Sequence, residues 1–387
     1  MNLLAIPNDP TKAYFRCSED EFLGEFNPMD KDKRFFENVY FLNSRDNSEI
    51  EFHGIKSFPV MKDKSRLDRA LKNGRRNDFV YPMFTEIYDK ERDDIISKAR
   101  SCNPNVIRTF NPCAMAELGI IVSRELGVPL IISAYDPSSL TAAVREADFV
   151  TCETQEVKER CISEYGVNPE KIEICYNGIE EDVFFKREDD EIRRVVDQRF
   201  LGYNNVILSC SRIVNGKNLE GILHALSLIK NDFSSLVHLH LGAEKDKKKK
   251  QELIKLREKL GLQDISFFLG AQPKQDLPFY YSLADAYVLP SFWEGMNRSL
   301  REALFCETPV LTTNYGSTTE YVKDGYNGVL IDPYDIEDIA KGLEKILGNP
   351  AFRDSLSSNA RDSVIGEHSL KKTMADIVSV YKKVLGK

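Results

Sequence analysis

The chain has 387 residues, of which 42% are hydrophobic, so it is long enough to build two domains with cores of their own. Its formal net charge of -8 gives no overall positive field that would attract nucleic acid. The N-terminal apolar run is too short for a signal peptide, and no stretch reaches the roughly 18 apolar residues of a membrane-spanning helix, so a cytoplasmic protein is expected. The eight cysteines include no CxxC pair and no histidine at metal-ligand spacing, which indicates reduced core thiols and no metal site.

The first 60 residues contain three strand-like runs, NLLAIP, NVYFLN and EIEFHGIKSFPV. No GxGxxG motif follows the first run, so a dinucleotide-binding fingerprint is absent. The next segment, KDKSRLDRALKNGRR, begins at Lys62, ends at Arg76 and holds seven basic residues against two acidic ones. Two interpretations stay open for it: a solvated helix face, or a helix that rests on an anionic membrane surface or binds an anionic acceptor.

From residue 93 onwards, helix-like and strand-like segments alternate regularly. Helices are predicted over residues 93–101, 114–126, 138–147 and 156–166, and strands over 105–110, 128–136 and 149–153. This βαβ pattern predicts a parallel sheet that is covered on both faces. Residues 186–199 are almost entirely charged apart from scattered valines, and a domain boundary is therefore placed after residue 185.

The alternation restarts in the second half, which predicts a second Rossmann-like domain. Strands are predicted over 205–212, 237–242, 265–270, 286–289 and 328–331, and helices over 218–230, 245–261, 299–305, 335–347 and 371–385. The fold class is therefore α/β, with two Rossmann-like parallel-sheet domains over residues 1–185 and 186–368. The last segment, 369–387, is expected to form a helix that packs back toward the N-terminal domain.

The best candidate for a ligand site is the turn that joins the strand 286–289 to the following helix, since open α/β sheets place ligands at the carboxyl ends of their strands. Gly295 would let the backbone approach a ligand closely, and uncapped amides at the helix start would bind a phosphate or an anionic sugar oxygen. Glu294 lies in this turn, and Glu302 follows Arg298 by one helical turn. Two carboxylates beside an anion site are understandable if the ligand also carries hydroxyl groups. Taken alone, the pair could also be a turn residue and a helix-surface residue.

A second candidate loop, SRIVNGK, follows the first strand of the second half. Arg212 and Lys217 are five residues apart in this loop, and Gly216 gives the loop conformational freedom. Both cations could therefore bind the same diphosphate. The alternative is a surface loop with two solvated cations. Both candidate loops lie at the carboxyl edge of the same predicted sheet. Cations that could bind phosphates would there lie next to carboxylates that could bind hydroxyl groups.

Together these segments resemble the retaining glycosyltransferases of family 4, which have the GT-B fold and use nucleotide-sugar donors. The resemblance covers roughly residues 100 to 385. It rests on an ordered series of residues: Asn177-Gly178 followed by Phe184 or Phe185, Arg212 with Lys217, Leu283-Ala284-Asp285, Glu294-Gly295 through Glu302-Ala303, Thr308-Pro309-Val310, Glu320, and Gly325 with Gly328. It implies two domains that face each other across a cleft, with the acceptor on the N-terminal side and the nucleotide sugar on the C-terminal side.

By this resemblance, Arg212 and Lys217 would bind the donor diphosphate and neutralise the leaving group. Glu294 would bind hydroxyls of the donor sugar, and Glu302 would bind the ribose. Further donor contacts are implied for the turn and for the end of the strand 265–270, near which the base would stack: Gly295, Met296, Asn297, Arg298 and Ser299, and Gly270, Ala271 and Gln272. Family members retain anomeric configuration through a front-face transfer in which the leaving phosphate accepts the acceptor's proton. No cofactor, protein nucleophile or metal is then expected.

Two departures from the family limit what can be transferred. Tyr135 and Asp136 stand where the family commonly has a histidine, so the contact to the outer hydroxyl of the sugar is altered, and both remain candidate donor-binding residues. Pro7-Asn8-Asp9-Pro10 replaces the glycine-rich loop that usually follows the first strand. The donor, UDP- or GDP-linked, and the acceptor therefore stay open.

The predicted function is transfer of a sugar from a nucleotide-diphosphate sugar to a hydroxyl of a glycan or lipid-linked acceptor, in synthesis of cell-surface polysaccharide or glycoconjugate. The enzyme would be cytoplasmic or peripheral at the inner membrane face. One alternative is a nucleotide-sugar epimerase or hydrolase on the same fold, for which Asp136 is the only candidate acid or base. Another is a non-catalytic partner subunit, although such a scaffold has no physical need for Arg212, Lys217, Glu294 and Glu302.

Overall fold

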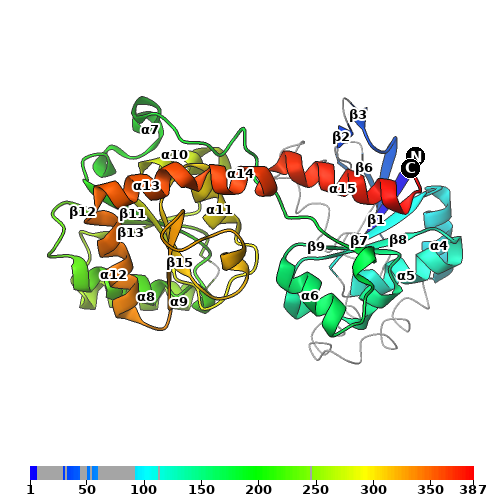
Figure 1. Cartoon of the computed structure of the whole chain (residues 1–387), viewed down its shortest axis with the longest axis horizontal. Helices are drawn as coiled ribbons and strands as arrows, with labels where there is room; N and C mark the ends of the chain where they lie inside the picture. Colours follow the sequence, from blue (N-terminus) through cyan, green and yellow to red (C-terminus); the bar gives the residue numbers. More distant parts are fainter. Residues whose placement is uncertain are drawn as a thin grey trace. The chain divides into compact units, whose positions relative to one another are not determined.

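The computed structural model describes residues 1–6, 29–30, 33–43, 50–52, 55–59, 92–111, 114–244 and 246–387. The basic segment 62–76 and the loop 7–10 lie outside the described residues. The chain forms two compact units, one of Met1–Asn177 together with Leu370–Lys387 and one of Gly178–Ser369 (Figure 1).

The first unit is built on an eight-stranded sheet with the order β10-β9-β8-β7-β1-β4-β6-β5. All neighbouring strands are parallel except β5, which pairs antiparallel with β6, and β2 and β3 form a separate antiparallel pair. The central strands are buried on both faces and mostly apolar, as is typical of parallel sheets, although β7 also buries Arg108 and Thr109. The strands are β1 (Asn2–Ile6), β2 (Met29–Asp30), β3 (Lys33–Arg34), β4 (Asn38–Asn43), β5 (Ile50–Phe52), β6 (Ile55–Pro59), β7 (Val106–Phe110), β8 (Leu130–Ala134), β9 (Phe149–Cys152) and β10 (Ile172–Ile174).

The helices of this unit are α4 (Arg92–Ser101), α5 (Ala114–Leu126), α6 (Gln155–Ser163) and α15 (Leu370–Val384). The helix predicted over residues 138–147 is wrong, because the chain forms two short 3-10 turns there, η2 (Pro137–Ser139) and η3 (Ala142–Glu146). Asp136 and Thr141 cause the interruption: each has an extended backbone, and its side chain accepts a hydrogen bond from an amide two residues later.

The second unit has a six-stranded, fully parallel sheet with the order β13-β12-β11-β14-β15-β16. The strand order reverses between β11 and β14, so the loops that leave these two strands meet at a topological switch point, where open α/β sheets bind ligands. The strands are β11 (Asn205–Cys210), β12 (Leu236–Leu241), β13 (Ser266–Gly270), β14 (Ala286–Leu289), β15 (Val310–Thr313) and β16 (Gly328–Ile331).

Helices cover both faces of this sheet, with α8, α9 and α12 on one side and α10 and α11 on the other (Figure 1). A separate apolar cluster fills the space on each side. The helices are α7 (Asp189–Val195), α8 (Leu219–Ile229), α9 (Lys247–Lys259), α10 (Leu277–Leu283), α11 (Arg298–Phe305), α12 (Ile336–Leu347), α13 (Pro350–Ala360) and α14 (Asp362–His368). The α/β class and the two parallel Rossmann-like sheets predicted from the sequence are thus confirmed.

The two units divide at residues 177 and 178, earlier in the chain than the predicted boundary after residue 185. Ile179 and Phe184 explain the difference, because both are fully buried in the core of the second unit and the Ile179 amide bonds the His368 carbonyl. At the other end, α15 belongs to the first unit, where Tyr381 stacks on Phe35 and accepts a hydrogen bond from Arg108.

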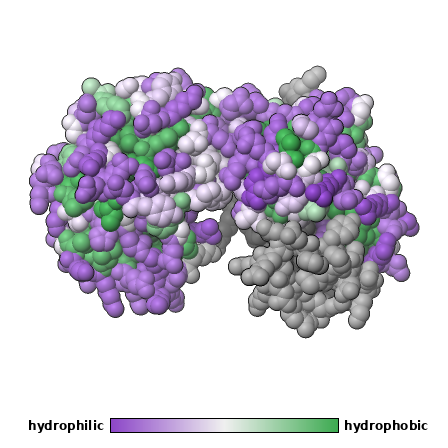
Figure 2. Space-filling model, turned by 60° about the horizontal axis from the view of Figure 1, so that its bottom comes forward, coloured by the Kyte–Doolittle hydropathy of each residue, from purple (hydrophilic) through white to green (hydrophobic). Residues whose placement is uncertain are grey.

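The described surface gives no sign of a membrane-spanning segment. Within the described ranges, no helix combines the length and apolar character needed to cross a bilayer. Hydrophilic residues predominate on the described part of the face shown in Figure 2, and hydrophobic residues gather there in smaller patches.

Candidate active site

The candidate site is built on the loops that leave β11 and β14 at the switch point. The loop after β11 contains η6 (Asn215–Lys217), and Asn218 then starts α8 in a left-handed conformation with its side chain capping the Gly221 amide. Pro290 ends β14, and the Phe292 amide donates to the Gly216 carbonyl at 3.1 Å. This backbone bond holds the two loops side by side.

Lys217 and Glu294 meet across these loops. The Lys217 Nζ lies 2.6 Å from the Glu294 Oε1, and the other carboxylate oxygen accepts a hydrogen bond from Asn297 Nδ2 at 2.9 Å. Glu294 is only 5% exposed, so its charge has to be compensated within the protein. The structure therefore brings the predicted phosphate-binding cation and the predicted sugar-binding carboxylate into direct contact.

A third loop, after β15, fixes the backbone of Glu294. The Glu294 carbonyl accepts a hydrogen bond from the Ser317 amide at 2.9 Å, and Glu294 forms a parallel bridge with Gly316. Gly316 has a φ of +73°, and a Cβ there would lie 1.9 Å from the Glu294 carbonyl oxygen. Only glycine allows this close approach, so Gly316 is a site-building residue that the sequence analysis missed.

The start of α11 is capped, which corrects the expectation of free amides at this point. The helix begins at Arg298, and the Asn297 Oδ1 accepts hydrogen bonds from the Leu300 amide at 3.0 Å and from the Ser299 hydroxyl at 2.9 Å. The same hydroxyl lies 2.7 Å from the Cys210 carbonyl oxygen, an alternative acceptor for its one hydrogen, and this contact ties α11 to the end of β11. The cap occupies one amide position that a ligand was expected to use.

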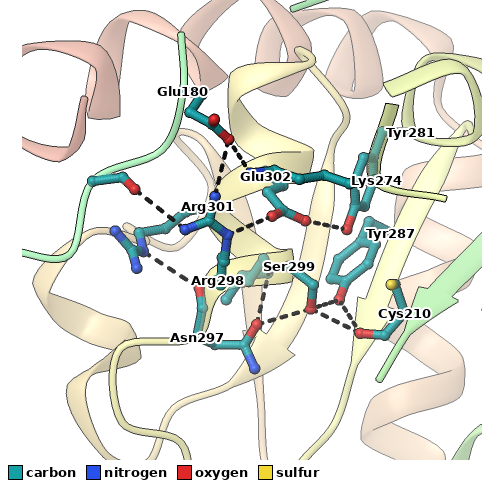
Figure 3. Close-up of polar contacts among 12 residues, drawn as sticks. Glu180, Cys210, Lys274, Tyr281, Tyr287, Asn297, Arg298, Ser299, Arg301 and Glu302 are labelled. Carbon is teal, nitrogen blue, oxygen red and sulfur yellow. Dashed lines mark hydrogen bonds and ion pairs between the residues drawn. The ribbon is translucent and has the colours of Figure 1, made fainter. Parts of the chain in front are cut away.

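Glu302 lies one helical turn along α11, and both of its oxygens are bonded (Figure 3). Arg298 Nε donates to Oε1 at 2.9 Å, and the Tyr281 hydroxyl donates to Oε2 at 2.9 Å. Burial raises the pKa of Tyr281 well above its usual value, so this hydroxyl stays protonated and remains a donor. Glu302 is 5% exposed, and these two donors set the orientation of its carboxylate.

Arg298 also reaches Glu180, which the sequence analysis did not single out. The Arg298 guanidinium lies 3.4 Å from the Glu180 carboxylate, and Lys274 forms a second ion pair with Glu180 (Figure 3). The result is a chain of alternating charge, Lys274, Glu180, Arg298 and Glu302, which we call the charge chain. Glu180 comes two residues after Asn177-Gly178, and Lys274 comes soon after β13, so only the fold brings them together.

The other predicted residues of the second unit lie along the same sheet edge. Arg212 follows β11 and is exposed, and its guanidinium forms no ion pair with any residue that the structure describes. Gly270 ends β13 with a φ of +76°, and its carbonyl accepts a hydrogen bond from the Gly242 amide at 2.9 Å. Ala271 follows Gly270, and Gln272 donates to the Leu269 carbonyl at 3.0 Å. Met296 packs against the core.

Tyr135 and Asp136 belong to the first unit, at the end of β8. Tyr135 stacks on Phe110 with ring centroids 6.2 Å apart, and Asp136 caps η2 by accepting a hydrogen bond from the Ser138 amide. The aspartate therefore has a local structural role in addition to its predicted one. Among the described residues, no group of three or more His, Cys, Asp or Glu side chains is arranged to hold a metal ion.

Comparison with known proteins identifies the class of this fold. The sequence model of the family described as "Glycosyl transferases group 1" matches residues 194–363. An uncharacterized glycosyltransferase of Methanocaldococcus jannaschii is 26% identical over 281 residues, which cover 70% of either chain. The mannosylfructose-phosphate synthase of Agrobacterium fabrum is 28% identical over 206 residues, which cover 52% of this chain and 45% of the synthase.

Solved structures share the architecture along the whole chain. Anabaena HepE in complex with UDP matches with a TM-score of 0.77 and 17% identity, over 99% of this chain and 100% of HepE. The sucrose-phosphate synthase of Thermosynechococcus elongatus matches with a TM-score of 0.75 and 16% identity, over 100% of both chains. The chain has the GT-B fold, and its residues 194–363 match the group 1 glycosyltransferase family.

Proposed function

We propose that the protein is a retaining glycosyltransferase that moves a sugar from a UDP- or GDP-linked donor to a hydroxyl of a glycan or lipid-linked acceptor. The pathway would be synthesis of cell-surface polysaccharide or glycoconjugate. The observation that carries the proposal is the 2.6 Å contact between Lys217 and Glu294 at the switch point. A nucleotide sugar is a ligand that needs a cation for its phosphates and a carboxylate for its hydroxyls side by side.

The ion pair suggests how the donor would enter. A diphosphate arriving between Arg212 and Lys217 would draw Lys217 away from Glu294, and the released Oε1 could then accept hydrogen bonds from the donor sugar. The same two cations would stabilise the negative charge that develops on the leaving diphosphate. Glu302 would hold the ribose, and the base would lie near Gly270, Ala271 and Gln272.

One of the structural relatives supports a nucleotide-sugar donor. Anabaena HepE, which shares the fold, has been solved with UDP and also with UDP-glucose. Retention would follow from a front-face transfer, in which the leaving phosphate accepts the proton of the acceptor hydroxyl and no side chain acts as nucleophile. NMR of the first product formed from an α-linked donor tests this directly: an α-linked product supports retention, and a β-linked product contradicts it.

A thermal-shift screen with UDP, GDP, ADP and CMP tests the donor. A ligand that binds only the native state raises the melting temperature by mass action, by an amount that grows with its concentration. We expect UDP or GDP to give the largest rise, and Lys217→Ala to reduce it. If no nucleoside diphosphate at millimolar concentration shifts the wild-type protein, the proposal fails.

The acceptor prediction concerns the basic segment 62–76, which lies outside the described residues. A lipid-linked or anionic acceptor would be drawn to it, with an attraction that weakens as salt shortens the Debye length to about 8 Å at physiological ionic strength. We predict salt-sensitive binding to anionic vesicles that falls when four residues are changed together to glutamine: Arg69, Lys72, Arg75 and Arg76. The matched control changes four exposed lysines of α9 to glutamine: Lys247, Lys248, Lys255 and Lys259. Wild-type protein that stays unbound in a flotation assay at low salt would favour the solvated helix.

A further inference from the structure

Three aromatic side chains lie together beside Glu294 at the carboxyl edge of the second sheet. Phe292 and Tyr334 stack with centroids 4.9 Å apart, and Tyr315 meets Tyr334 edge-on at 6.2 Å. Trp293 lies between Phe292 and Glu294 in the chain and is 45% exposed, while Tyr315 is 42% and Tyr334 68% exposed. We call Phe292, Tyr315 and Tyr334 the aromatic shelf.

The aromatic shelf is attached to the backbone that holds the candidate site. Phe292 bonds Gly216, next to Lys217, and Tyr315 precedes Gly316, which is paired with Glu294. In the loop after β16, the carbonyl of Pro333 accepts a hydrogen bond from the Asn218 side chain at 2.8 Å. Pro333 immediately precedes Tyr334. The loops after β11, β14, β15 and β16 therefore carry both the Lys217–Glu294 pair and the shelf, so a ligand that touches one lies next to the other.

Exposed rings in contact with one another need an explanation, because large apolar groups gathered on a surface usually mark a binding site. Tyrosine and tryptophan combine a flat apolar face with a polar edge. A pyranose ring has the matching chemistry, with a flat face of C–H groups and a rim of hydroxyls. The aromatic shelf thus offers stacking surface for a sugar within reach of the carboxylate that is proposed to bind the donor sugar.

The charge around the shelf separates a neutral sugar from an anionic membrane. Four carboxylates follow Ile331 at the end of β16 and in the first turn of α12: Asp332, Asp335, Glu337 and Asp338. They would repel the anionic lipid to which interfacial aromatic residues are otherwise suited. Carboxylates are, by contrast, strong acceptors for sugar hydroxyls.

We propose that the aromatic shelf is a second saccharide-binding subsite, which stacks a neutral sugar unit of the acceptor glycan beside the donor. The shelf as a sugar site rests on its own geometry, and its assignment to the acceptor rests on the proposed function. Stacking on Tyr334 and Tyr315 would place an acceptor hydroxyl toward Glu294 and Lys217. The subsite would add affinity and specificity for the acceptor and take no part in breaking the donor bond.

Trp293 is the only tryptophan of the chain, and it is exposed and directly follows Phe292 of the shelf, so we use its fluorescence as the probe. Wild-type protein is first applied to an array of neutral and acidic glycans, and the strongest neutral oligosaccharide is then titrated against Trp293 fluorescence. We expect Tyr334→Ala and Tyr315→Ala each to weaken binding about tenfold. Tyr326→Ala is the matched control, since Tyr326 is also a 46% exposed tyrosine but precedes β16 at the opposite edge of the sheet.

The proposal that the shelf binds a neutral sugar fails if no neutral glycan binds, or if Tyr326→Ala loses binding as much as Tyr334→Ala does. It also fails if Tyr334→Ala weakens attachment to anionic vesicles or changes the oligomeric state in sedimentation. A thermal-shift measurement with UDP and GDP on the same variants keeps the two proposals separate. We expect Tyr334→Ala to keep the nucleotide-induced shift while it loses glycan binding. If wild-type protein binds glycan but no nucleotide, the proposed function fails and the shelf stands as a sugar site.

Discussion

Glu294 and Glu302 are two equally buried carboxylates on one loop and helix, each 5% exposed, but their surroundings differ. Glu294 is compensated by Lys217, a cation from the loop of another strand, and by the amide of Asn297. Glu302 likewise has both oxygens bonded, but by Arg298 one turn earlier in the same helix and by the hydroxyl of Tyr281 from α10. Arg298 is further held by Glu180, and Glu180 by Lys274.

The difference shows that the surroundings of a buried glutamate decide whether it can exchange partners or is held in one orientation. A single ion pair between two loops can open when a diphosphate competes for the lysine, so Glu294 is suited to change partners during binding. Glu302 is instead preorganised, because its partner Arg298 is itself held by Glu180. This limits the loss of conformational freedom when a ribose binds. Each prediction below tests one side of this comparison.

The largest effect is expected from Lys217→Ala. The change removes the cation that pairs with Glu294 and that would face the leaving diphosphate, so we expect the transfer rate to fall by about 10²-fold or more. Lys217 lies in a loop, and folding should suffer far less than activity. Steady-state kinetics with the donor identified by the thermal-shift screen provides the measurement.

Lys248→Ala is the matched control, because Lys248 is exposed and only pairs with Glu252 within α9. It should leave rate and melting temperature unchanged. A folded Lys217→Ala protein with near wild-type turnover would refute the phosphate role of this loop.

The second prediction is that Glu294→Gln and Glu302→Gln fail differently. Glu302→Gln should weaken binding of the free nucleoside diphosphate about tenfold, because a neutral amide is a weaker acceptor for ribose hydroxyls. Glu294→Gln should leave that binding nearly intact and impair sugar transfer. Calorimetric titration of both variants with the nucleoside diphosphate decides the matter, and equally poor binding by both would show the assignment to be wrong.

A smaller effect is expected from Glu180→Gln. The change removes the negative charge between Lys274 and Arg298, and Arg298 then holds Glu302 less firmly. We expect nucleoside diphosphate affinity to fall about fivefold with kcat nearly unchanged, since Glu180 acts through Arg298 and does not touch the substrate. The preference for the ribose over the 2′-deoxy nucleotide should fall with it.

Asp182→Asn is the control for Glu180→Gln, as an exposed acidic residue of the same segment. An affinity loss that is identical for ribose and deoxyribose nucleotides would assign Glu180 a purely structural role. In that case the charge chain would not be what holds the Glu302 carboxylate in place for the ribose.

The sequence was sufficient for the sheets because a parallel strand must be apolar on both faces, and runs such as NVILSC and AYVL stand out against charged helices. It was also sufficient to place Lys217 and Glu294 on one sheet edge, since both follow strand ends. Their direct contact could not be foreseen, because it depends on β14 lying next to β11. The charge chain could not be foreseen either. Glu180 and Lys274 are far apart in the sequence, and charged residues are too frequent for the sequence to show which of them form ion pairs.

Other differences follow from local signals that were present but not weighed. Asparagine is a preferred N-cap, so Asn297 before an amphipathic run indicated a capped α11. Thr141 and Asp136 likewise favour turns and caps over a continuous helix, which explains the interruption at residues 138–147. Gly316 could be recognised only once its φ and its distance to Glu294 were known.

The smallest effect is expected from chelation. A divalent cation would have to displace Lys217 from Glu294 or Arg298 from Glu302, and both carboxylates already have their charge balanced by these side chains. Arg212 and Lys217 would supply the positive charge that phosphates otherwise take from magnesium or manganese. We therefore expect activity after EDTA treatment and buffer exchange to equal that of untreated enzyme. Recovery of activity only on adding manganese or magnesium would contradict this, and it would mean that the Glu294 pair opens to a metal ion rather than to the donor alone.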